Sequence, residues 1–278
     1  MLTNLATPTT DFGVPFVVNA DQGRVTLVTV ATYNEIESLP RLVAAIRDAA
    51  PDVDILVVDD NSPDGTGRWC DDQRERDPRL HVLHRTGKLG LGTAIVAAMR
   101  YAIEHGYEYV LNMDADFSHD PKHLPALIAG MQPQEGPPLD VMIGSRYVAG
   151  GAVEGWPLHR QAMSKLVNAY ARWLLGLDVR DCSGAYRCYR TSLLAKVDFD
   201  AIRSRGYSFQ EEILWRLKLL GARMAETPIT FVDRVHGKSK ISPREAFSAL
   251  GVILSLATEK SRPRKTQPLQ QSGDVASR

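Results

Sequence analysis

Short apolar runs alternate with longer segments of helical period from about residue 24 onward. The runs are rich in β-branched residues, are bounded by turn residues, and cover positions 25–30, 54–59, 80–83, 109–113 and 141–143. Between them, apolar residues recur at spacings of three and four, as in Leu39, Leu42 and Ile46. Alternating strands and helices predict an α/β fold in which a mainly parallel central sheet carries helices on both faces.

The rhythm of the sequence changes after Arg146. The later half predicts helices over 157–177 and 209–220 and strands over 185–189 and 224–232. A chain of 278 residues suffices for one large α/β domain or two smaller ones, and we interpret this half as completing the site of the first. The predicted organisation is an N-terminal extension over 1–23, one α/β domain over 24–243, an interfacial helix over 244–260 and a disordered polar tail over 261–278.

Charge balance and cysteine content narrow the class of protein. The chain has 33 Lys and Arg against 33 Asp and Glu, whereas binding nucleic acid with the whole surface requires an excess of positive charge. We therefore predict no nucleic-acid partner.

Three cysteines leave one unpaired under any pairing, which is typical of a reducing compartment. The first residues lack the basic and apolar regions of a secretory signal, so the sequence predicts a cytoplasmic location.

Polar residues follow the first two predicted strands. The first strand ends in Ala31, Tyr33, Asn34 and Glu35, and the second ends in Asp59 and Asp60. Because ligands of parallel sheets bind at the carboxyl ends of the strands, these groups can hydrogen-bond the base and ribose of a nucleotide. Tyr33 supplies an apolar face. The alternative for residues 61–64, Asn-Ser-Pro-Asp, is a turn and a helix cap.

A glycine-rich loop over residues 84–94 leads into the third predicted helix. Its backbone amides and Lys88 can meet a phosphate. The spacing of the glycines fits neither G-x-G-x-x-G nor G-x-x-x-x-G-K-[ST], so a dehydrogenase or a P-loop ATPase is not supported.

The sharpest local feature is Asp114-Ala115-Asp116 at the end of the fourth run. Alternate carboxylates at a strand end can aim two hard oxygen ligands at one Mg²⁺ or Mn²⁺, which a diphosphate can share. The same spacing also occurs in capped turns.

The later half supplies cations that would form a phosphate clamp if they converge and would be surface charges if they do not: Arg146, Arg160, Lys165, Arg187, Arg234, Lys238 and Lys240.

Taken in order, eight segments resemble one family. They are A-T-Y-N-E, V-V-D-D-N-S-P-D-G-T, K-x-G-L-G-T-A, M-D-A-D-x-S-H-x-P, G-S-R-Y-V-x-G-G, D-x-S-G-A-Y-R-x-Y-R, G-Y-S-F-Q and P-I-T-F-V-D-R-x-x-G-x-S-K-I. This order, from about Arg24 to Ser242, resembles the polyprenol (dolichol) phosphate mannosyltransferases, which are family 2 glycosyltransferases with a GT-A fold. The resemblance is greatest to the bacterial polyprenol monophosphomannose synthases.

The resemblance, together with the strand-end and loop residues above, implies a set of site residues. The nucleotide-sugar set is Ala31, Tyr33, Asn34, Glu35, Val58, Asp60, Lys88, Asp114, Ala115, Asp116, Arg146, Gln210, Arg234 and Lys240. The metal set is Asp114, Asp116 and Ser118, and the acceptor-phosphate set is Arg146, Arg160 and Ser164. The catalytic set is Asp114, Asp116, Arg146, Arg234 and Lys240. Two positions depart from the family: Ala31 stands where many relatives have Pro, and Ser118 stands where some have a Gln ligand.

The family likeness implies transfer of mannose from GDP-mannose to a polyprenyl (dolichyl-type) monophosphate, with inversion and with Mg²⁺ or Mn²⁺. The product would be a lipid-linked mannose donor for glycosylation of glycoconjugates or proteins. A phosphate monoester whose second pKa is about 6 is largely dianionic at pH 7, so the attack requires no strong general base. Three alternatives stay open: another sugar such as glucose from UDP-glucose, a D-x-D phosphotransferase, and a nucleotide-sugar-binding protein without activity.

A polyprenyl acceptor implies a membrane surface as a partner. The longest apolar stretch near the end, 246–257, is far shorter than the roughly 20 residues of a membrane span. Peripheral attachment to the cytoplasmic face, or attachment through a membrane-protein partner, is therefore expected. Two segments are candidates. The first is 161–177, which has an apolar helical face of Met163, Leu166, Val167, Tyr170, Trp173 and Leu174, and the second is 246–257, which is followed by Lys260, Arg262, Arg264 and Lys265. The second is favoured because it lies beyond the predicted sheet.

Overall fold

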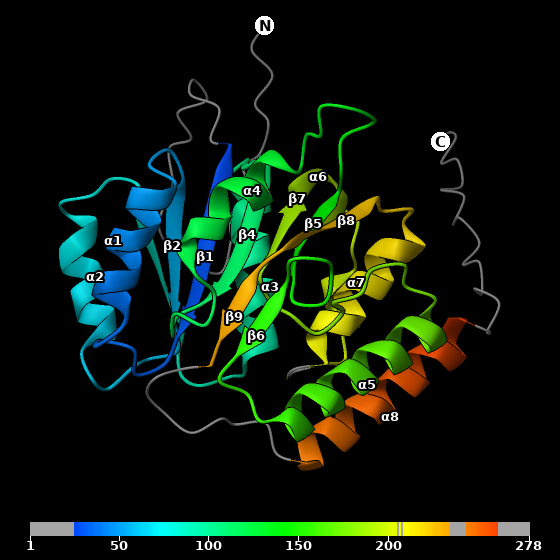
Figure 1. The fold of residues 1–278 in the computed structure, drawn as a ribbon. Helices are drawn as coiled ribbons and strands as arrows, with labels where there is room; N and C mark the ends of the chain where they lie inside the picture. The colour runs from blue at the N-terminus through cyan, green and yellow to red at the C-terminus, as the bar shows by residue number, and fades with distance from the viewer. Residues whose placement is uncertain (1–24, 205, 207, 234–242, 261–278) are drawn as a thin grey trace, which may run out of the picture.

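The computed structural model describes residues 25–204, 206, 208–233 and 243–260, and it confirms an α/β fold around a mainly parallel sheet (Figure 1). The seven-stranded sheet has the order β3-β2-β1-β4-β7-β5-β8, and a second, two-stranded sheet pairs β6 with β9. The strands are β1 Thr26–Thr32, β2 Asp54–Asp59, β3 Leu80–His84, β4 Tyr109–Asp114, β5 Val141–Ser145, β6 Ala152–Glu154, β7 Arg187–Arg190, β8 Met224–Pro228 and β9 Thr230–Val232. Only β7 runs antiparallel to its neighbours among these described strands.

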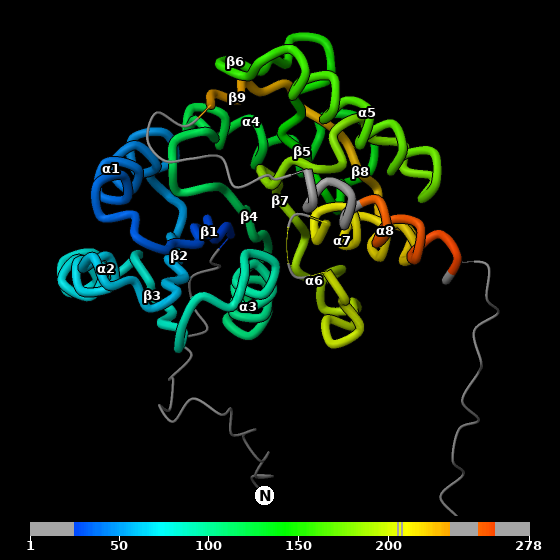
Figure 2. Tube along the Cα trace, turned by 90° about the horizontal axis from the view of Figure 1, so that it is seen from below, coloured from blue at the N-terminus to red at the C-terminus, as the bar shows by residue number. Residues whose placement is uncertain are grey.

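Helices cover both faces of the large sheet, as Figure 2 shows from below. Alternate strand residues face opposite sides, so Val28 and Val30 join one apolar cluster with α1, α2 and α4, while Leu27 and Val58 join another with α3 and α5 to α8. The α-helices are α1 Leu39–Ala49, α2 Thr66–Arg74, α3 Leu91–Glu104, α4 Leu124–Ala129, α5 Leu158–Leu175, α6 Thr191–Leu194, α7 Phe209–Leu219 and α8 Pro243–Lys260. Two short 3-10 helices are η1 Pro121–His123 and η2 Phe199–Ala201.

One predicted strand is wrong in its extent. The sequence predicts a single strand over 224–232, but the structure divides it into β8, which pairs with β5, and β9, which pairs with β6. Pro228 ends β8 because it has no N–H to donate to the ladder. Beyond it, Ile229 donates to the carbonyl of Ser145 and accepts from Ala152, so the chain crosses here from one sheet to the other.

Helices α5 and α8 lie side by side at one end of the molecule (Figure 1). In α8, Ile253 and Leu256 are buried against the core, whereas α5 exposes Leu158, Leu166 and Trp173. Leu254 of α8 is half exposed and the side chains of 246–249 lie outside the described ones, so the preference for 246–257 stays a prediction, while α5 offers a second exposed apolar face. In the part of the chain that the structure describes, none of the helices has the length and apolar content that crossing a bilayer requires.

Candidate active site

Three predicted site residues form one row across the sheet. Ala31 of β1 is paired with Val58 of β2 on one side and with Asp114 of β4 on the other. All three also line one cavity, which the first turns of α3 close with Leu91 and Ala94. Since β1, β2 and β4 are parallel, their carboxyl ends meet at this edge, as the sequence predicts.

The two loops beyond this row hold each other in place. Asn34 and Asn61 adopt the left-handed region, with φ of 62° and 57°, and Asn34 donates its backbone N–H to the Ser62 hydroxyl. Asp59 is buried and accepts hydrogen bonds from Thr32 Oγ1 and from the Ser62 N–H, at 3.0 Å each. The Asn61–Asp64 segment is therefore largely a folded turn. Its hydrogen bonds to Asn34 and Asp59 shape the loops that follow β1 and β2.

Tyr33 and Lys88, which lie 55 positions apart in the sequence, come together at the mouth of the site. The ammonium of Lys88 lies 4.3 Å from the centroid of the Tyr33 ring. A cation over an aromatic face is stabilised by the ring quadrupole, so both side chains are held at the rim.

Asp60 and Glu35 lie deeper in the same region. Arg85 Nε lies 3.0 Å from Asp60 Oδ1, and burial raises the pKa of Asp60 against the opposing pull of this arginine. Glu35 accepts a hydrogen bond from the Ser38 hydroxyl at 2.9 Å, and its backbone N–H donates to Thr66 Oγ1.

Hydrogen bonds from Ser118 hold the Asp114-Ala115-Asp116 turn. Asp116 Oδ1 accepts from the backbone N–H of Ser118 at 3.1 Å and from the Ser118 hydroxyl. Phe117 between them has a φ of 61°, a conformation that is rare for a bulky residue and is found mainly where function requires it. The Ser118 hydroxyl is buried and donates to Asp116, so the structure uses it to orient that carboxylate, and its role as a metal ligand stays a prediction.

The donor set of this turn fits a hard divalent cation. Asp114 and Asp116 offer carboxylate oxygens at a strand end, and the Asp114 side chain is 31% exposed. The described residues contain no group of three or more His, Cys, Asp or Glu placed to hold a metal ion. Two carboxylates alone suit Mg²⁺ or Mn²⁺, which take their other ligands from waters and substrate phosphates.

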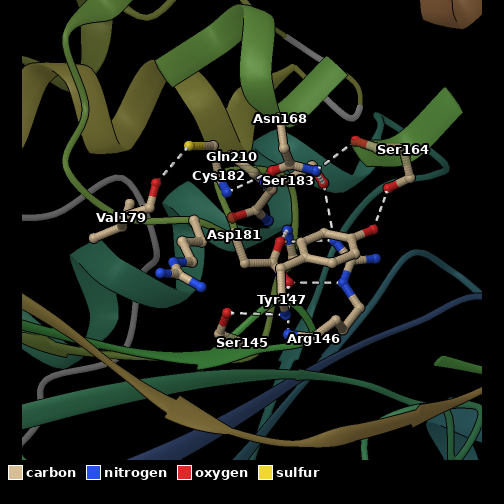
Figure 3. A network of polar contacts seen from close by, with 12 residues as sticks. Ser145, Arg146, Tyr147, Ser164, Asn168, Val179, Asp181, Cys182, Ser183 and Gln210 are labelled. Atoms are coloured by element: carbon tan, nitrogen blue, oxygen red, sulfur yellow. Dashed lines mark hydrogen bonds and ion pairs between the residues drawn. The ribbon is translucent and has the colours of Figure 1, made fainter. Parts of the chain in front are cut away.

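Arg146 lies in a buried network at the end of β5 (Figure 3). Its Nε and Nη2 atoms donate to the two carboxylate oxygens of Asp181 at 2.7 Å each, and Nη2 also donates to Ser183. Burial disfavours the charge of Arg146, but the ion pair with Asp181 outweighs it and raises the pKa of the arginine. Arg146 is therefore a paired cation, and only part of its guanidinium can reach a ligand.

The other predicted acceptor residues lie on α5. Arg160 pairs with Asp233 at 3.2 Å and lies 4.0 Å from the centroid of the Trp156 ring. The Ser164 hydroxyl accepts a 2.7 Å hydrogen bond from Tyr147. Each of the three predicted acceptor residues, Arg146, Arg160 and Ser164, is therefore held by a specific side-chain partner.

Gln210 opens α7 and is 3% exposed. Neither of its amide atoms has a hydrogen-bond partner among the described residues. Because buried amides rarely stay unpaired, the predicted role of Gln210 toward a ligand fits its environment. The next residue, Glu211, is also buried, and burial raises its pKa to about 7.

One of the predicted cations, Arg187, has a different environment from the one expected. Arg187 was one of the cations expected at the surface or in a clamp. It is fully buried and donates to the carbonyls of Gln210 and Cys182. Arg234 and Lys240 lie outside the described residues, so their roles stay predictions. The three cysteines are buried and free.

Sequence patterns assigned no role to three residues that contact the site. They are His119, which bonds Asp114, and Tyr147 and Asp181, which contact Arg146. His119 and Tyr147 lie directly beside Ser118 and Arg146, which the resemblance predicts, and Asp181 is the first residue of the D-x-S-G segment. An isolated buried charge such as Asp181 could have been suspected as the partner of Arg146, but their pairing is visible only in the fold.

The sheet order and the paired carboxylates at its carboxyl edge define a glycosyltransferase with a GT-A fold. Solved structures of glucosyl-3-phosphoglycerate synthase from Mycobacterium tuberculosis share this fold. One complex with Mn²⁺, UDP and glucosyl-3-phosphoglycerate has a TM-score of 0.57 at 18% identity and covers 87% of this chain and 82% of that one. Another, with Mn²⁺, UDP and phosphoglyceric acid, has a TM-score of 0.59 at 18% identity and covers 86% and 78%.

The model of glycosyl transferase family 2 matches residues 27–198, and the chain belongs to this family. It is 48% identical over 216 residues to an undecaprenyl-phosphate mannosyltransferase from Micrococcus luteus, covering 78% of this chain and 87% of the relative. It is 46% identical over 218 residues to a polyprenol monophosphomannose synthase from Mycolicibacterium smegmatis, covering 78% and 81%. The recognised family is thereby confirmed.

Proposed function

We propose that the protein transfers mannose from GDP-mannose to a polyprenyl monophosphate, with inversion, giving a polyprenyl-phosphate-mannose that serves as a lipid-linked donor for glycosylation. The observation that carries this proposal is the row of Val58, Ala31 and Asp114, because it brings the polar residues that follow β1 and β2 and the Asp114-Ala115-Asp116 turn to one edge of the sheet. The names of the two relatives above support mannose as the sugar and a polyprenyl phosphate as the acceptor.

Asp60 supports guanine as the donor base. An ionised carboxylate only accepts hydrogen bonds, and guanine presents an exocyclic amino group beside its ring N–H. Uracil has no amino group at the corresponding position. The Arg85 partner at 3.0 Å limits the motion of Asp60, so one acceptor edge is kept in a fixed place.

Asp114 and Asp116 would hold Mg²⁺ or Mn²⁺ on the donor side. Such an ion, when bound, neutralises charge on the leaving diphosphate. The chain's own contribution is positioning: Ser118 fixes Asp116, and His119 fixes the backbone of Asp114. Arg234 and Lys240 are proposed to contact the donor diphosphate or the lipid phosphate, as the family resemblance implies.

Arg146, Arg160 and Ser164 would bind the acceptor phosphate. Its oxygen attacks the anomeric carbon in line with the leaving diphosphate, and the bond from sugar to diphosphate breaks. Because the phosphate is already dianionic near pH 7, these residues need to orient and hold it rather than remove a proton.

The exposed face of α5 supports peripheral binding to a membrane surface. Leu158 is 82% exposed, Leu166 66% and Trp173 79%, and they recur at spacings of eight and seven, which places them on one side of the helix. Lys165 and Arg172 are exposed beside them. Apolar residues flanked by cations suit an anionic bilayer, where the polyprenyl chain of the acceptor resides. The cytoplasmic face and a membrane-protein partner remain part of this proposal.

The test of the transfer reaction is direct. Purified protein is incubated with polyprenyl phosphate in vesicles, a divalent cation and radiolabelled GDP-mannose, and the lipid fraction is analysed for a mannolipid. UDP-glucose, UDP-mannose and GDP-glucose in parallel reactions separate sugar choice from base choice. Label incorporated only from a glucose donor would overturn the mannose assignment, and release of inorganic phosphate without a glycolipid would indicate a phosphotransferase.

A further inference from the structure

Tyr147 contacts two of the residues proposed to bind the acceptor phosphate. Its hydroxyl donates to Ser164 Oγ at 2.7 Å, and its ring centroid lies 5.1 Å from the guanidinium carbon of Arg146. Figure 3 shows the ring between the end of β5 and helix α5. The Tyr147 side chain therefore bridges the segment after β5, which carries the arginine, and the helix that carries the serine.

A second connection joins the same two elements. Asn168 of α5 donates to the Ser164 carbonyl at 2.8 Å and to Ser183 Oγ at 3.0 Å, and Ser183 Oγ also accepts from Arg146 Nη2 at 2.9 Å. Asn168 Oδ1 in turn accepts from the backbone N–H of Cys182 at 2.6 Å. The separation of Arg146 and Ser164 is thus fixed both through Tyr147 and through Asn168 (Figure 3).

These bonds leave specific hydrogen-bonding groups of Ser164 and Arg146 unused. Tyr147 occupies a lone pair of Ser164 Oγ, so the hydroxyl proton of Ser164 is left to donate, and no described residue accepts it. Likewise Asp181 and Ser183 use Nε and Nη2 of Arg146, and no described residue bonds Nη1. The remaining groups are donors only, which selects an anion with several acceptor oxygens.

We propose that Tyr147 is a positioning residue for the acceptor phosphate, holding the Ser164 hydroxyl and the Arg146 guanidinium so that both direct their remaining donors at one phosphate group. This rests on the proposed function, in which Arg146 and Ser164 bind the phosphate of the lipid. Burial raises the pKa of Tyr147, so its hydroxyl keeps the proton that it donates to Ser164. We propose no other role for Tyr147 in the reaction.

The informative variant is Tyr147→Phe, because it keeps the ring against Arg146 and removes only the hydroxyl. We expect the KM for polyprenyl phosphate to rise about three- to tenfold, as the loss of one hydrogen bond implies, while the KM for GDP-mannose stays within about twofold. Ser164→Ala should behave similarly. The double variant should lose no more than Ser164→Ala alone, because the tyrosine hydroxyl acts through that serine.

Tyr170→Phe on the same helix is the matched control, since no hydrogen bond of the Tyr170 hydroxyl occurs among the described residues, and it should leave both KM values unchanged. Binding of farnesyl phosphate without donor, measured by calorimetry, gives a second readout that does not depend on turnover and should weaken by the same factor in Tyr147→Phe.

The outcomes separate the two proposals. A wild-type protein that makes no mannolipid, yet binds farnesyl phosphate more tightly than Tyr147→Phe does, overturns the proposed function and supports the positioning role. An active wild-type protein whose Tyr147→Phe variant is unchanged, or whose two substitutions are additive, overturns the positioning role. Equal increases in the KM of donor and acceptor, or no binding of farnesyl phosphate by the wild type, overturn it as well.

Discussion

The Nδ1 atom of His119 accepts a 3.0 Å hydrogen bond from the backbone N–H of Asp114. Since that N–H can only donate, Nδ1 carries no proton, and the neutral ring has its proton on Nε2. The ring is 2% exposed and is stacked on Tyr186 with centroids 4.8 Å apart. His119 therefore fixes the first aspartate of the Asp114-Ala115-Asp116 turn through the main chain.

Substitution of His119 should weaken cation binding in a way that depends on the acceptor atom. His119→Phe keeps a ring against Tyr186 but removes the acceptor, and we expect Mn²⁺ affinity in the presence of GDP to fall about tenfold or more, as for other residues that orient metal ligands. His119→Asn retains an oxygen near the position of Nδ1 and should lose less affinity, although it packs less well and should melt at a lower temperature.

Electron paramagnetic resonance of bound Mn²⁺ and thermal melting measure these two effects separately. His123→Phe is the control, because His123 Nε2 accepts from the backbone of Thr230 instead. Unchanged Mn²⁺ affinity in His119→Phe would contradict the role given to His119.

The two aspartates themselves should be indispensable. Asp114→Ala or Asp116→Ala is expected to lower kcat by roughly a hundredfold or more, because stabilisation of the leaving diphosphate by a bound cation is worth several kcal/mol. Their circular dichroism should match the wild type. EDTA should abolish transfer, and Mn²⁺ or Mg²⁺ should restore it. Asp120→Ala, in the same loop, removes the cap of η1 and an ion pair with Lys122 and should retain activity. Transfer that persists in EDTA would disprove the cation requirement.

The sequence predicts the strands of the first half closely, since each combines a β-branched run with turn residues. β2 over Asp54–Asp59 matches its prediction at both ends. The position of β7 in the sheet could not be predicted in this way. Its antiparallel place between β4 and β5 depends on pairing Arg187 with both Asn112 and Ile143, and no local pattern encodes such distant partners.

The same distinction applies to the site. The row of Val58, Ala31 and Asp114 follows from strand ends that the sequence reveals. The state of Arg146 does not, because its charge is balanced by Asp181, 35 positions away, and the carboxylate could not be matched to the arginine from spacing. Sequence patterns thus located the cations, whereas only packing shows which of them are already paired.

Adjacent glutamates at the start of α7 should respond oppositely to pH. Burial raises the pKa of Glu211 to about 7, from an ordinary value of 4.5, against the attraction of Arg187 and Arg146 and with the repulsion of Asp181. Between these two values the folded state holds a proton that the unfolded state has lost, so Glu211 reduces stability as pH rises. Glu211→Gln should therefore raise the melting temperature by several degrees at pH 8 relative to wild type, and by little at pH 4.5.

Glu212 provides the matched comparison. It accepts from the Ser204 hydroxyl at 2.6 Å and from Arg216 at 2.9 Å, and although burial opposes its charge, these bonds lower its pKa. Its stabilisation is present above the unfolded value and is lost as pH falls through the folded one. Glu212→Gln should lower the melting temperature most at pH 7 to 8 and least in acid. Parallel pH profiles for both variants would refute this assignment.

Arg234 and Lys240 should matter through phosphate contacts. Loss of an exposed ion pair costs up to about 1 kcal/mol, or roughly a fivefold effect. We expect Arg234→Ala or Lys240→Ala to lower kcat/KM by much more than that, measured with donor and acceptor varied in turn. Lys218→Ala is the control, since Lys218 pairs only loosely with Asp178 at 3.7 Å. Near wild-type kinetics would identify both residues as surface charges.

The exposed face of α5 should govern membrane binding. Leu158, Leu166 and Trp173 point away from the core, so replacing all three with Ser should leave the melting temperature nearly unchanged. Fully removing a leucine side chain from water contributes roughly 1.5–3 kcal/mol, so the triple variant should bind anionic vesicles at least about tenfold more weakly in flotation.

Each exposed cation beside the face adds about 1 kcal/mol near anionic lipid, so Lys165→Gln with Arg172→Gln should reduce binding less and should flatten its salt dependence. Leu219→Ser at the end of α7, outside both candidate segments, serves as the control for loss of an exposed leucine. If the triple variant floats like the wild type while deletion of residues 261–278 abolishes binding, the membrane contact belongs to the tail and not to α5.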